Sequence, residues 1–181
     1  MSALTVTAAV LVIGDEILSG RTKDKNIGYI AEYLARIGVD LKEARVVPDV
    51  EEEIVAALNA LRARYDYVIT TGGIGPTHDD ITADAVARAF GVPIGEDPRA
   101  IAIMLERYAE ADLTPARRRM ARMPEGAVLI ENPISRAPGF RIGNVFVLAG
   151  VPSVMQAMLD GAVKEMRTGA VMQVATVEAG Q

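Results

Sequence analysis

The chain has 181 residues, of which 50% are hydrophobic and 24% charged, and this length and composition are those of a single packed domain. Its formal net charge of −5 argues against a nucleic-acid binder, because such proteins use Lys and Arg to neutralise phosphates. Since the chain has no cysteine, disulfides, thiolate metal sites and cysteine nucleophiles are excluded.

The first half of the chain alternates predicted strands with predicted helices. Residues 6–13 form a nearly continuous apolar run, which is typical of a strand buried on both faces, and residues 39–47 and 67–70 are further strand candidates. After each strand, apolar residues recur at helical spacing, at 26–37, 54–61 and 81–90. Strands that alternate with helices over short loops favour a parallel sheet covered on both faces. This half is therefore predicted to be doubly wound α/β.

The second half of the chain is less regular. Helices are expected at 98–108, at 153–166 and from Thr114 onward, where Thr114 can cap the helix and Pro115 suits its first turn. Short strands are expected at 128–130, 140–142 and 145–148, and Gly143-Asn144 resembles a two-residue hairpin turn between the last two. A small part of the sheet should therefore be antiparallel. We place one domain at residues 1–168 and a tail at 169–181.

The N-terminus lacks the basic segment of a signal peptide, and no stretch reaches the ~18 apolar residues of a membrane span. These features predict a cytoplasmic protein without a membrane partner.

Loops of unusual composition follow four of the predicted strands. They comprise residues 14–20, 47–49, 70–82 and 149–152. Ligands of open parallel sheets bind beyond the carboxyl ends of the strands. We therefore expect these loops to converge on a single cleft.

The run Thr71-Gly72-Gly73-Ile74-Gly75-Pro76-Thr77 lies between a predicted strand and a predicted helix. Glycine permits positive φ and lacks Cβ, so the N–H groups of Gly72 to Gly75 can face a shared anion-binding hollow, to which the helix N-terminus adds its dipole. The alternative is a tight connection that needs glycine only for the turn. The strand before, the helix after and the interleaved polar residues favour a phosphate-binding loop.

Carboxylates near this loop are candidates for the chemistry. Asp79 and Asp80 precede the helix, so one of them is a candidate N-cap while the other approaches the anion pocket. A carboxylate repels an anionic ligand unless a divalent metal ion bridges the two, and Asp49 offers a second metal ligand from a neighbouring loop. The alternative for Asp49 is a turn residue that follows Pro48.

Other polar residues have more than one interpretation. His78 is the only histidine, which excludes a multi-histidine metal site in this chain, and it is either an acid, base or single ligand or a solvated loop residue. Asp15, Glu16 and Asn26 either line the cleft or begin the structure that follows them. The arginine cluster at residues 117–122 is interpreted as a solvated helix face, with recognition of a phosphate tail as the alternative.

Several motifs of the chain resemble the molybdopterin-binding domain family. They are Gly14-Asp15-Glu16-Ile17-Leu18-Ser19-Gly20, Asn26, Pro48-Asp49, the run from Thr71 to Thr82, Ala137-Pro138-Gly139-Phe140 and Gly150-Val151-Pro152. Their order and spacing match over nearly the whole chain. The resemblance is nearest to the N-terminal domain of the competence/damage-inducible protein A family, and the chain is also similar to the corresponding domain of eukaryotic FAD synthases.

The resemblance implies a three-layer α/β/α domain with a mostly parallel sheet and a site at the strand ends for a phosphorylated pterin or a nucleotide. In the two branches just named, related activities are metal-assisted cleavage of the pyrophosphate of ADP-ribose or FAD. In molybdopterin adenylyltransferases, residues that match Asp49 and Asp80 serve nucleotidyl transfer. We therefore predict Asp49 and Asp80 to be the catalytic residues and the ligands of a divalent metal ion.

The predicted substrate-binding residues come from the same motifs: Gly14, Asp15, Glu16, Asn26, Thr71, Gly72, Gly73, Gly75, Thr77, Pro138, Gly139, Gly150 and Pro152. Three functions remain open: a nucleotide pyrophosphatase, which we favour, a non-catalytic binding module for molybdopterin or a nucleotide, and a molybdopterin adenylyltransferase. The adenylyltransferases usually carry Thr where this chain has Ile74, which disfavours the third. Family members form dimers or trimers, so we also expect a homo-oligomer.

Two motifs depart from the family pattern. Ser135-Arg136-Ala137-Pro138-Gly139 stands where Gly-Thr-Ala-Pro-Gly is frequent, and Leu148-Ala149-Gly150-Val151-Pro152 stands where Leu-Pro-Gly-x-Pro is frequent. These differences leave the identity of the substrate open. Longer competence/damage-inducible proteins also carry an amidohydrolase domain that deamidates nicotinamide mononucleotide. The residues after Met166 are too few for that domain, so we expect this activity to be absent.

Overall fold

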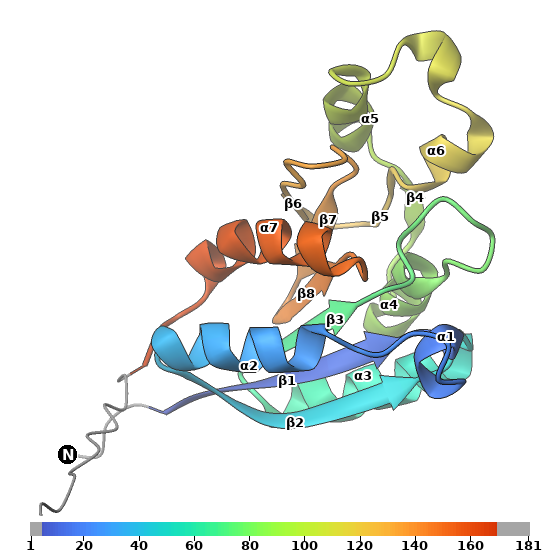
Figure 1. The fold of residues 1–181 in the computed structure, drawn as a ribbon. Helices are drawn as coiled ribbons and strands as arrows, with labels where there is room; N and C mark the ends of the chain where they lie inside the picture. Colours follow the sequence, from blue (N-terminus) through green and yellow to red (C-terminus); the bar gives the residue numbers. More distant parts are fainter. Residues whose placement is uncertain (1–4, 170–181) are drawn as a thin grey trace, which may run out of the picture.

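The apolar runs of the sequence become strands of a six-stranded sheet in the computed structural model, which describes residues 5–169 (Figure 1). The strands are β1 (Val6–Ile13), β2 (Val39–Val47), β3 (Tyr67–Thr71), β6 (Val128–Ile130), β7 (Gly139–Ile142) and β8 (Val145–Leu148). Their spatial order is β2-β1-β3-β8-β7-β6. The first four in this order are parallel, whereas β7 and β6 are antiparallel to their neighbours. This confirms the predicted mostly parallel sheet with a small antiparallel part.

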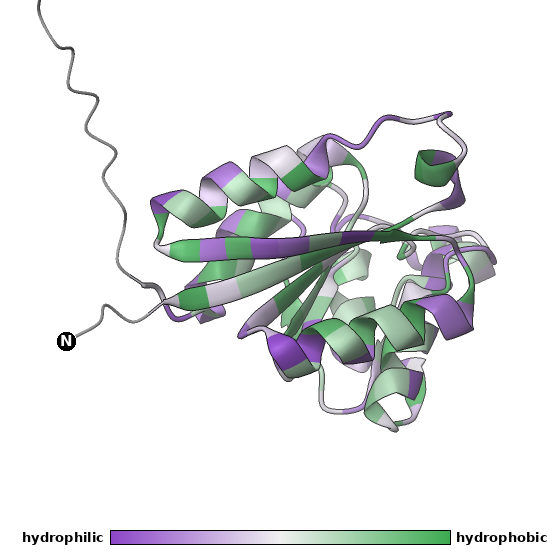
Figure 2. Ribbon diagram, turned by 90° about the horizontal axis from the view of Figure 1, so that it is seen from below, coloured by the Kyte–Doolittle hydropathy of each residue, from purple (hydrophilic) through white to green (hydrophobic). Residues whose placement is uncertain are grey.

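Helices cover both faces of the sheet, so the domain has three layers (Figure 2). On one face, α3 (Glu51–Arg64) and α4 (Thr82–Phe90) form a core with alternate residues of β1, including Leu11. On the other face, α2 (Asn26–Arg36) and α7 (Pro152–Ala162) pack on the intervening residues, including Val10. Because successive side chains of a strand point to opposite faces, β1 must be apolar at nearly every position.

The four parallel strands end together at one edge of the sheet. Ile13 pairs with Val47, Val12 with Thr71, and Thr71 in turn with Leu148. The loops that follow these strands therefore leave the sheet at the same edge, as the sequence predicted.

Residues 94–124 form an arm that projects from the sheet and is drawn in green to yellow in Figure 1. At its base β4 (Ile94–Glu96) pairs with β5 (Arg122–Pro124), and between them lie α5 (Pro98–Leu105), the short 3-10 helix η1 (Glu110–Asp112) and α6 (Pro115–Arg119). β4 and β5 are not among the strands predicted from the sequence, because three residues are too few to reveal the alternation of a strand.

Several predicted boundaries are wrong. The helix expected at 98–108 ends at Leu105, and the helix that Thr114 caps has only five residues. The last helix begins at Pro152 and ends at Ala162, where the 3-10 helix η2 (Val163–Glu165) continues it, and the short helix α1 (Asp15–Leu18) was not predicted. Apart from Gly169, the predicted tail lies outside the described residues, and the domain boundary stays a prediction. Within the described part of the chain, no helix has the length and apolar character needed to cross a membrane.

Candidate functional site

The glycine-rich loop after β3 is fixed at its base by hydrogen bonds. The Gly72 N–H donates to the Leu148 carbonyl at 3.2 Å, and Thr82 donates its hydroxyl to the Gly72 carbonyl at 2.9 Å and its N–H to the Gly73 carbonyl at 3.0 Å. Gly72 and Gly73 have φ of +97° and +73°. A Cβ atom at these positions would lie 2.2 Å from the Ile13 carbonyl oxygen and 2.0 Å from Thr82 Oγ1, respectively. Both positions therefore require glycine.

Three successive N–H groups of this loop are available to a ligand. Within residues 5–169, the N–H groups of Gly73, Ile74 and Gly75 donate to no protein acceptor. The Gly72 N–H, which the sequence analysis included among the anion donors, is instead used by Leu148. The candidate anion site thus consists of residues 73–75, and it begins one residue later than the predicted site at residues 72–75.

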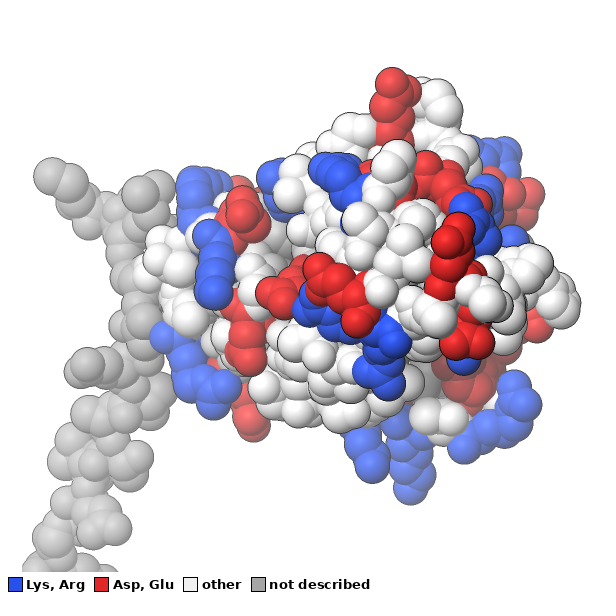
Figure 3. Space-filling view, turned by 90° about the horizontal axis from the view of Figure 1, so that it is seen from above, with Lys and Arg blue, Asp and Glu red and all other residues white. Residues whose placement is uncertain are grey.

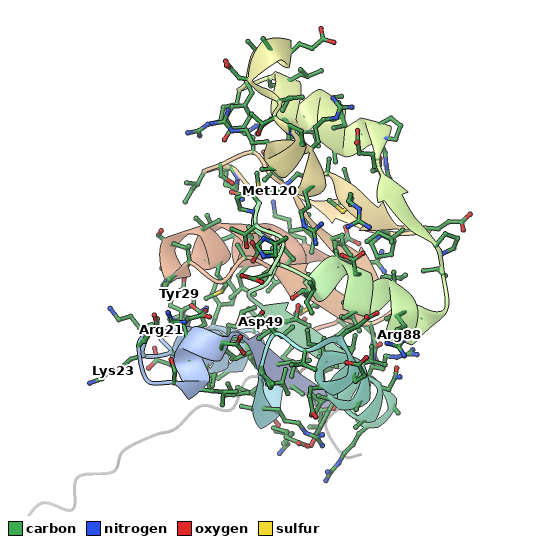
Figure 4. The ribbon with its side chains drawn as sticks, turned by 90° about the vertical axis from the view of Figure 1, so that its right-hand side faces the viewer. Arg21, Lys23, Tyr29, Asp49, Arg88 and Met120 are labelled. Carbon is green, nitrogen blue, oxygen red and sulfur yellow. The ribbon has the colours of Figure 1, made fainter. Side chains whose placement is uncertain are left out.

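A cleft of about 530 Å³, which we call the wide cleft, opens beside the glycine-rich loop. Loop residues 72–76 form one wall, residues 149–154 form a second, and Met120 from the arm contributes to a third with residues of the 132–137 segment. Most of this lining is apolar, and the polar side chains in it are Glu16, Thr22, Asp80, Asn132 and Ser135. Figure 4 looks onto the edge where the parallel strands end, with Met120 above this edge and Asp49 below it. The volume is in the range of small-molecule sites.

A second cavity of about 310 Å³, the acidic pocket, adjoins the wide cleft. Its lining includes the carboxylates of Asp15, Glu16, Asp49, Asp79 and Asp80, together with Arg21, Thr77, Ile13 and Gly73. Glu16, Gly73 and Asp80 line both cavities, so the two meet at these residues.

Hydrogen bonds orient the two predicted catalytic carboxylates. Asp49 Oδ2 accepts the Asp15 N–H at 3.0 Å, and Asp15 Oδ1 accepts the Asp49 N–H at 3.1 Å, which ties the loops after β1 and β2 together. Asp80 Oδ2 accepts both the N–H and the hydroxyl of Thr77, at 2.9 and 2.8 Å. In each carboxylate a second oxygen remains outside these bonds.

Burial raises the pKa of Asp49 above its ordinary value, and the negative charges of Asp15, Glu16 and Asp80 raise it further, while the hydrogen bond from the Asp15 N–H lowers it. The structure thus brings Asp49 and Asp80 to the same pocket, where they repel each other.

The donor set of the acidic pocket fits a hard divalent cation that shares oxygen atoms with a substrate. Carboxylate oxygens are the ligands that Mg²⁺ prefers, and a cation would relieve the repulsion around Asp49. No group of three Asp, Glu or His side chains in the described residues converges tightly enough to hold a metal ion alone. Mg²⁺ commonly uses one or two carboxylates and completes its shell with substrate phosphates and water, and Asp49 with Asp80 matches that arrangement.

The structure places the other predicted substrate-binding residues in two groups. Those that line at least one of the two cavities are Asp15, Glu16, Gly72, Gly73, Gly75, Thr77, Gly150 and Pro152. Those that line neither are Gly14, Asn26, Thr71, Pro138 and Gly139. Asn26 is buried and donates its Nδ2 to the Gly150 carbonyl at 2.9 Å, so it supports the cleft wall from behind. Thr71 and Gly139 lie within strands. The functional roles of all these residues stay predictions.

Three expectations about the flanking residues need correction or remain open. Neither Asp79 nor Asp80 caps α4, because Ile81 holds the N-cap position and no side chain bonds there. The His78 side chain is 91% exposed and lines neither cavity, in keeping with a solvated loop residue. The arginine cluster is more than a solvated face: Arg119 donates to the carbonyls of the glycine-rich loop, and Arg122 pairs with Asp84 in α4.

Several residues that line the cavities were not assigned to the site from the sequence, among them Arg21, Thr22, Met120, Asn132 and Ser135. Asn132 is the organising residue of its loop. It donates Nδ2 to Ser135 Oγ and to the Ala137 carbonyl, and its Oδ1 accepts the N–H groups of Ile134 and Ser135. The only signal of this role in the sequence was the position of an Asn shortly before the Ala137-Pro138-Gly139 motif.

Fold and site together define a three-layer α/β domain with a glycine-rich loop and two cavities at the edge where its parallel strands end. The chain belongs to the family described as probable molybdopterin binding domain, whose sequence profile matches residues 9–168. The resemblance stated from the sequence is therefore confirmed.

Known relatives agree with this membership. A CinA-like protein of Citrifermentans bemidjiense is 46% identical over 168 residues, which are 89% of this chain and 40% of that protein. The crystal structure of CinA from Thermoplasma acidophilum, described as of unknown function, has a TM-score of 0.82 and 37% identity, and the match covers 89% of this chain and 97% of that one. MoaB of Thermus thermophilus, a molybdopterin biosynthesis enzyme, shares the fold with a TM-score of 0.58 at 20% identity over 88% of this chain and 91% of its own. The chain thus spans less than half of the CinA-like protein.

Proposed function

We propose that this domain binds a dinucleotide across its two cavities and hydrolyses the pyrophosphate with a divalent metal ion held by Asp49 and Asp80. The observation that carries the proposal is that both carboxylates line the acidic pocket, which meets the wide cleft at Glu16, Gly73 and Asp80. A pyrophosphate at this junction would leave its organic group in the wide cleft. ADP-ribose and FAD are the substrate types that we favour.

The residues of the chain have separate tasks in this proposal. The N–H groups of Gly73, Ile74 and Gly75 bind phosphate oxygens, and Thr77 holds the Asp80 carboxylate in place through two hydrogen bonds. When bound, the metal ion supplies Lewis-acid polarisation of the phosphoryl oxygen and makes water more acidic. The water oxygen forms a bond to one phosphorus, the bridging phosphorus–oxygen bond breaks, and the water protons pass to the departing phosphate and to solvent. ADP-ribose thereby yields AMP and ribose 5-phosphate.

Incubation of the chain with ADP-ribose or FAD and either Mg²⁺ or Mn²⁺, scored by AMP release, tests this function. We expect release that requires the metal and stops on chelation. Tight binding of the same dinucleotides without product over long incubation would contradict the proposal.

A non-catalytic binding module is the second candidate. It is supported by the large and mainly apolar wide cleft, which could hold a ligand without any chemistry in the acidic pocket. The third candidate, a molybdopterin adenylyltransferase, would transfer AMP from ATP to molybdopterin. The fold shared with MoaB is compatible with it. Ile74 disfavours it, because Ile74 lines the wide cleft and the resemblance implies Thr at this position in the adenylyltransferases.

A further inference from the structure

The outer part of the glycine-rich loop, residues 77–80, carries Asp80 and is a separate turn beyond the base that Thr82 holds. Within this turn the Asp80 N–H donates to the Thr77 carbonyl at 3.1 Å, and the Thr77 N–H and hydroxyl donate to Asp80 Oδ2. The side chains of residues 78 and 79 are 91% and 80% exposed, so the turn has little packing of its own. The direction of the Asp80 carboxylate therefore depends on what holds the backbone of the turn.

Arg119, in α6 of the arm, holds both ends of this turn. Its Nε donates to the Thr77 carbonyl at 3.1 Å and its Nη2 to the Asp80 carbonyl at 3.3 Å. One guanidinium thus binds the two residues that fix the orientation of the Asp80 carboxylate. A planar guanidinium can reach two acceptors at once, whereas a Lys ammonium is a point charge on a flexible stem.

The guanidinium is itself held in place from α4. Asp84 Oδ2 lies 3.9 Å from Arg119 Nη2, and Asp84 also accepts two hydrogen bonds from Arg122, at 2.8 and 3.1 Å. The Arg119 side chain is 29% exposed, so most of its surface is packed. Its position is consequently set by α4 and the arm rather than by solvent.

Arg119 lines neither the wide cleft nor the acidic pocket. It lines a small hollow between the loop and the arm, where Gly73, Gly75 and Asp80 are also found. Its neighbour Met120 does line the wide cleft. Arg119 therefore has the geometry of a residue that acts on the site through the loop and not by contact with a ligand.

We propose that Arg119 is the positioning residue of this site, through which the arm orients the Asp80 carboxylate. The expected effect of Arg119 on kcat rests on the proposed hydrolysis. The expected effect on the structure, a tighter turn at residues 77–80, does not depend on any activity. Through Arg119 the arm also gains a role, since it otherwise contributes only Met120 to the wide cleft.

The test compares Arg119→Ala and Arg119→Lys with a matched control, Arg118→Ala. Arg118 is the adjacent arginine of α6, and it pairs with Glu96 on the surface, where its side chain is 43% exposed. The first measurement is amide hydrogen exchange of Thr77 and Asp80, because both N–H groups are hydrogen-bonded within the turn. We expect faster exchange at these two amides in Arg119→Ala, with unchanged protection in β1 and β3 and no effect of Arg118→Ala.

The second measurement is the hydrolysis of ADP-ribose with Mn²⁺. We expect Arg119→Ala to lower kcat by about tenfold or more, as for other residues that orient a metal ligand, with KM nearly unchanged. Arg119→Lys should keep part of the kcat because it restores one of the two hydrogen bonds.

Native exchange at Thr77 and Asp80 in Arg119→Ala would overturn the proposal. If Arg119→Ala instead loses protection throughout β1 and β3, the variant is destabilised as a whole and Arg119→Lys decides: native exchange at Thr77 and Asp80 in Arg119→Lys would then overturn the proposal. A wild-type chain without hydrolase activity would remove the proposed function and leave the exchange comparison decisive for Arg119.

Discussion

The two cavities at the strand ends differ in chemistry although they share three residues. The acidic pocket has five carboxylates and a single arginine, Arg21, which comes from the loop before α2 (Figure 4). The wide cleft is larger and mainly apolar, with no Lys or Arg in its described lining. Under the proposed function the two cavities would have different roles: the acidic pocket would hold the metal ion and the pyrophosphate, and the wide cleft would hold the organic group of the ligand.

The face of the molecule in Figure 3 shows acidic and basic side chains interspersed, in contrast to the concentration of carboxylates in the acidic pocket. A local excess of negative charge would repel an anionic ligand, so binding of such a ligand at this site requires a cation that offsets the repulsion. Changes confined to one cavity should therefore separate catalysis from binding.

The largest effect is expected for Asp80→Asn. This change keeps an acceptor for Thr77 but removes the charge that we propose to hold the metal ion, so turnover of ADP-ribose should fall by about a hundredfold or more. The measurement is AMP release at saturating Mn²⁺.

Asp40→Asn is the matched control for this variant. Asp40 is 52% exposed on β2 and lies near Lys42, away from both cavities. Equal turnover in Asp80→Asn and the wild type would remove Asp80 from the mechanism.

Gly73→Ala, in the loop shared by both cavities, should cause the largest loss of folding stability. The added Cβ would lie 2.0 Å from Thr82 Oγ1, at a φ of +73°. We expect a loss of about 3 kcal/mol in the free energy of unfolding, from the left-handed backbone and the overpacking together.

Gly20→Ala separates these two contributions. Gly20 has a similar φ of +79°, but no heavy atom lies within 4 Å of the position of its added Cβ. Urea unfolding should therefore show a loss of only about 1 kcal/mol for Gly20→Ala. Equal losses in the two variants would show that the Thr82 contact is unimportant.

A smaller effect is expected for Met120→Ala, which alters the lining of the wide cleft but not that of the acidic pocket. The loss of apolar contact should raise KM for ADP-ribose by up to about tenfold, with kcat little changed. Met120→Leu, which keeps the apolar volume, is the control. A fall in kcat at constant KM would place Met120 in the catalytic step and break the division between the cavities.

The smallest effect is expected for Asp49→Asn, as a gain in folding stability at neutral pH. Because the pKa of Asp49 is raised, the folded chain binds more protons than the unfolded chain just above the ordinary value of 3.8, and stability falls as pH rises through the raised pKa. The charged carboxylate thus lowers stability at neutral pH, and Asp49→Asn should increase it there, by less than the change in Gly73→Ala.

The gain from Asp49→Asn should vanish below pH 3.8, where the carboxyl is protonated in both states. Thermal unfolding across this pH range measures it. A gain that is independent of pH would show that charge repulsion in the acidic pocket is not its cause.

The sequence predicted the parallel half of the fold because that half depends on local patterns. Val6–Ile13 is apolar at nearly every position, and the helices after it have clear apolar stripes. Since parallel strands end at the same edge, the meeting of Asp49 with Asp80 followed from topology alone. Gly72 was wrongly included among the predicted phosphate-binding N–H groups. Its N–H is bonded to the Leu148 carbonyl, and only the pairing of β3 with β8 reveals this bond.

The arm could not be predicted, because its structure depends on distant partners. Arg119 bonds to residues 39 and 42 positions earlier in the chain, and Arg122 pairs with Asp84, 38 positions earlier. In the sequence, three consecutive arginines on a short helix are indistinguishable from a solvated face. Asn132 was missed for a similar reason, since its four hydrogen bonds depend on the fold of the loop after β6.

The central claim is that Asp49 and Asp80 together hold one divalent cation against the ligand's pyrophosphate. Anomalous diffraction from crystals grown with Mn²⁺ and a non-hydrolysable ADP-ribose analogue tests it most directly. The account predicts a manganese peak in contact with both carboxylates and with phosphate oxygens that face the N–H groups of Gly73 to Gly75. Pyrophosphate bound elsewhere on the chain, or bound at this loop without manganese, would contradict it.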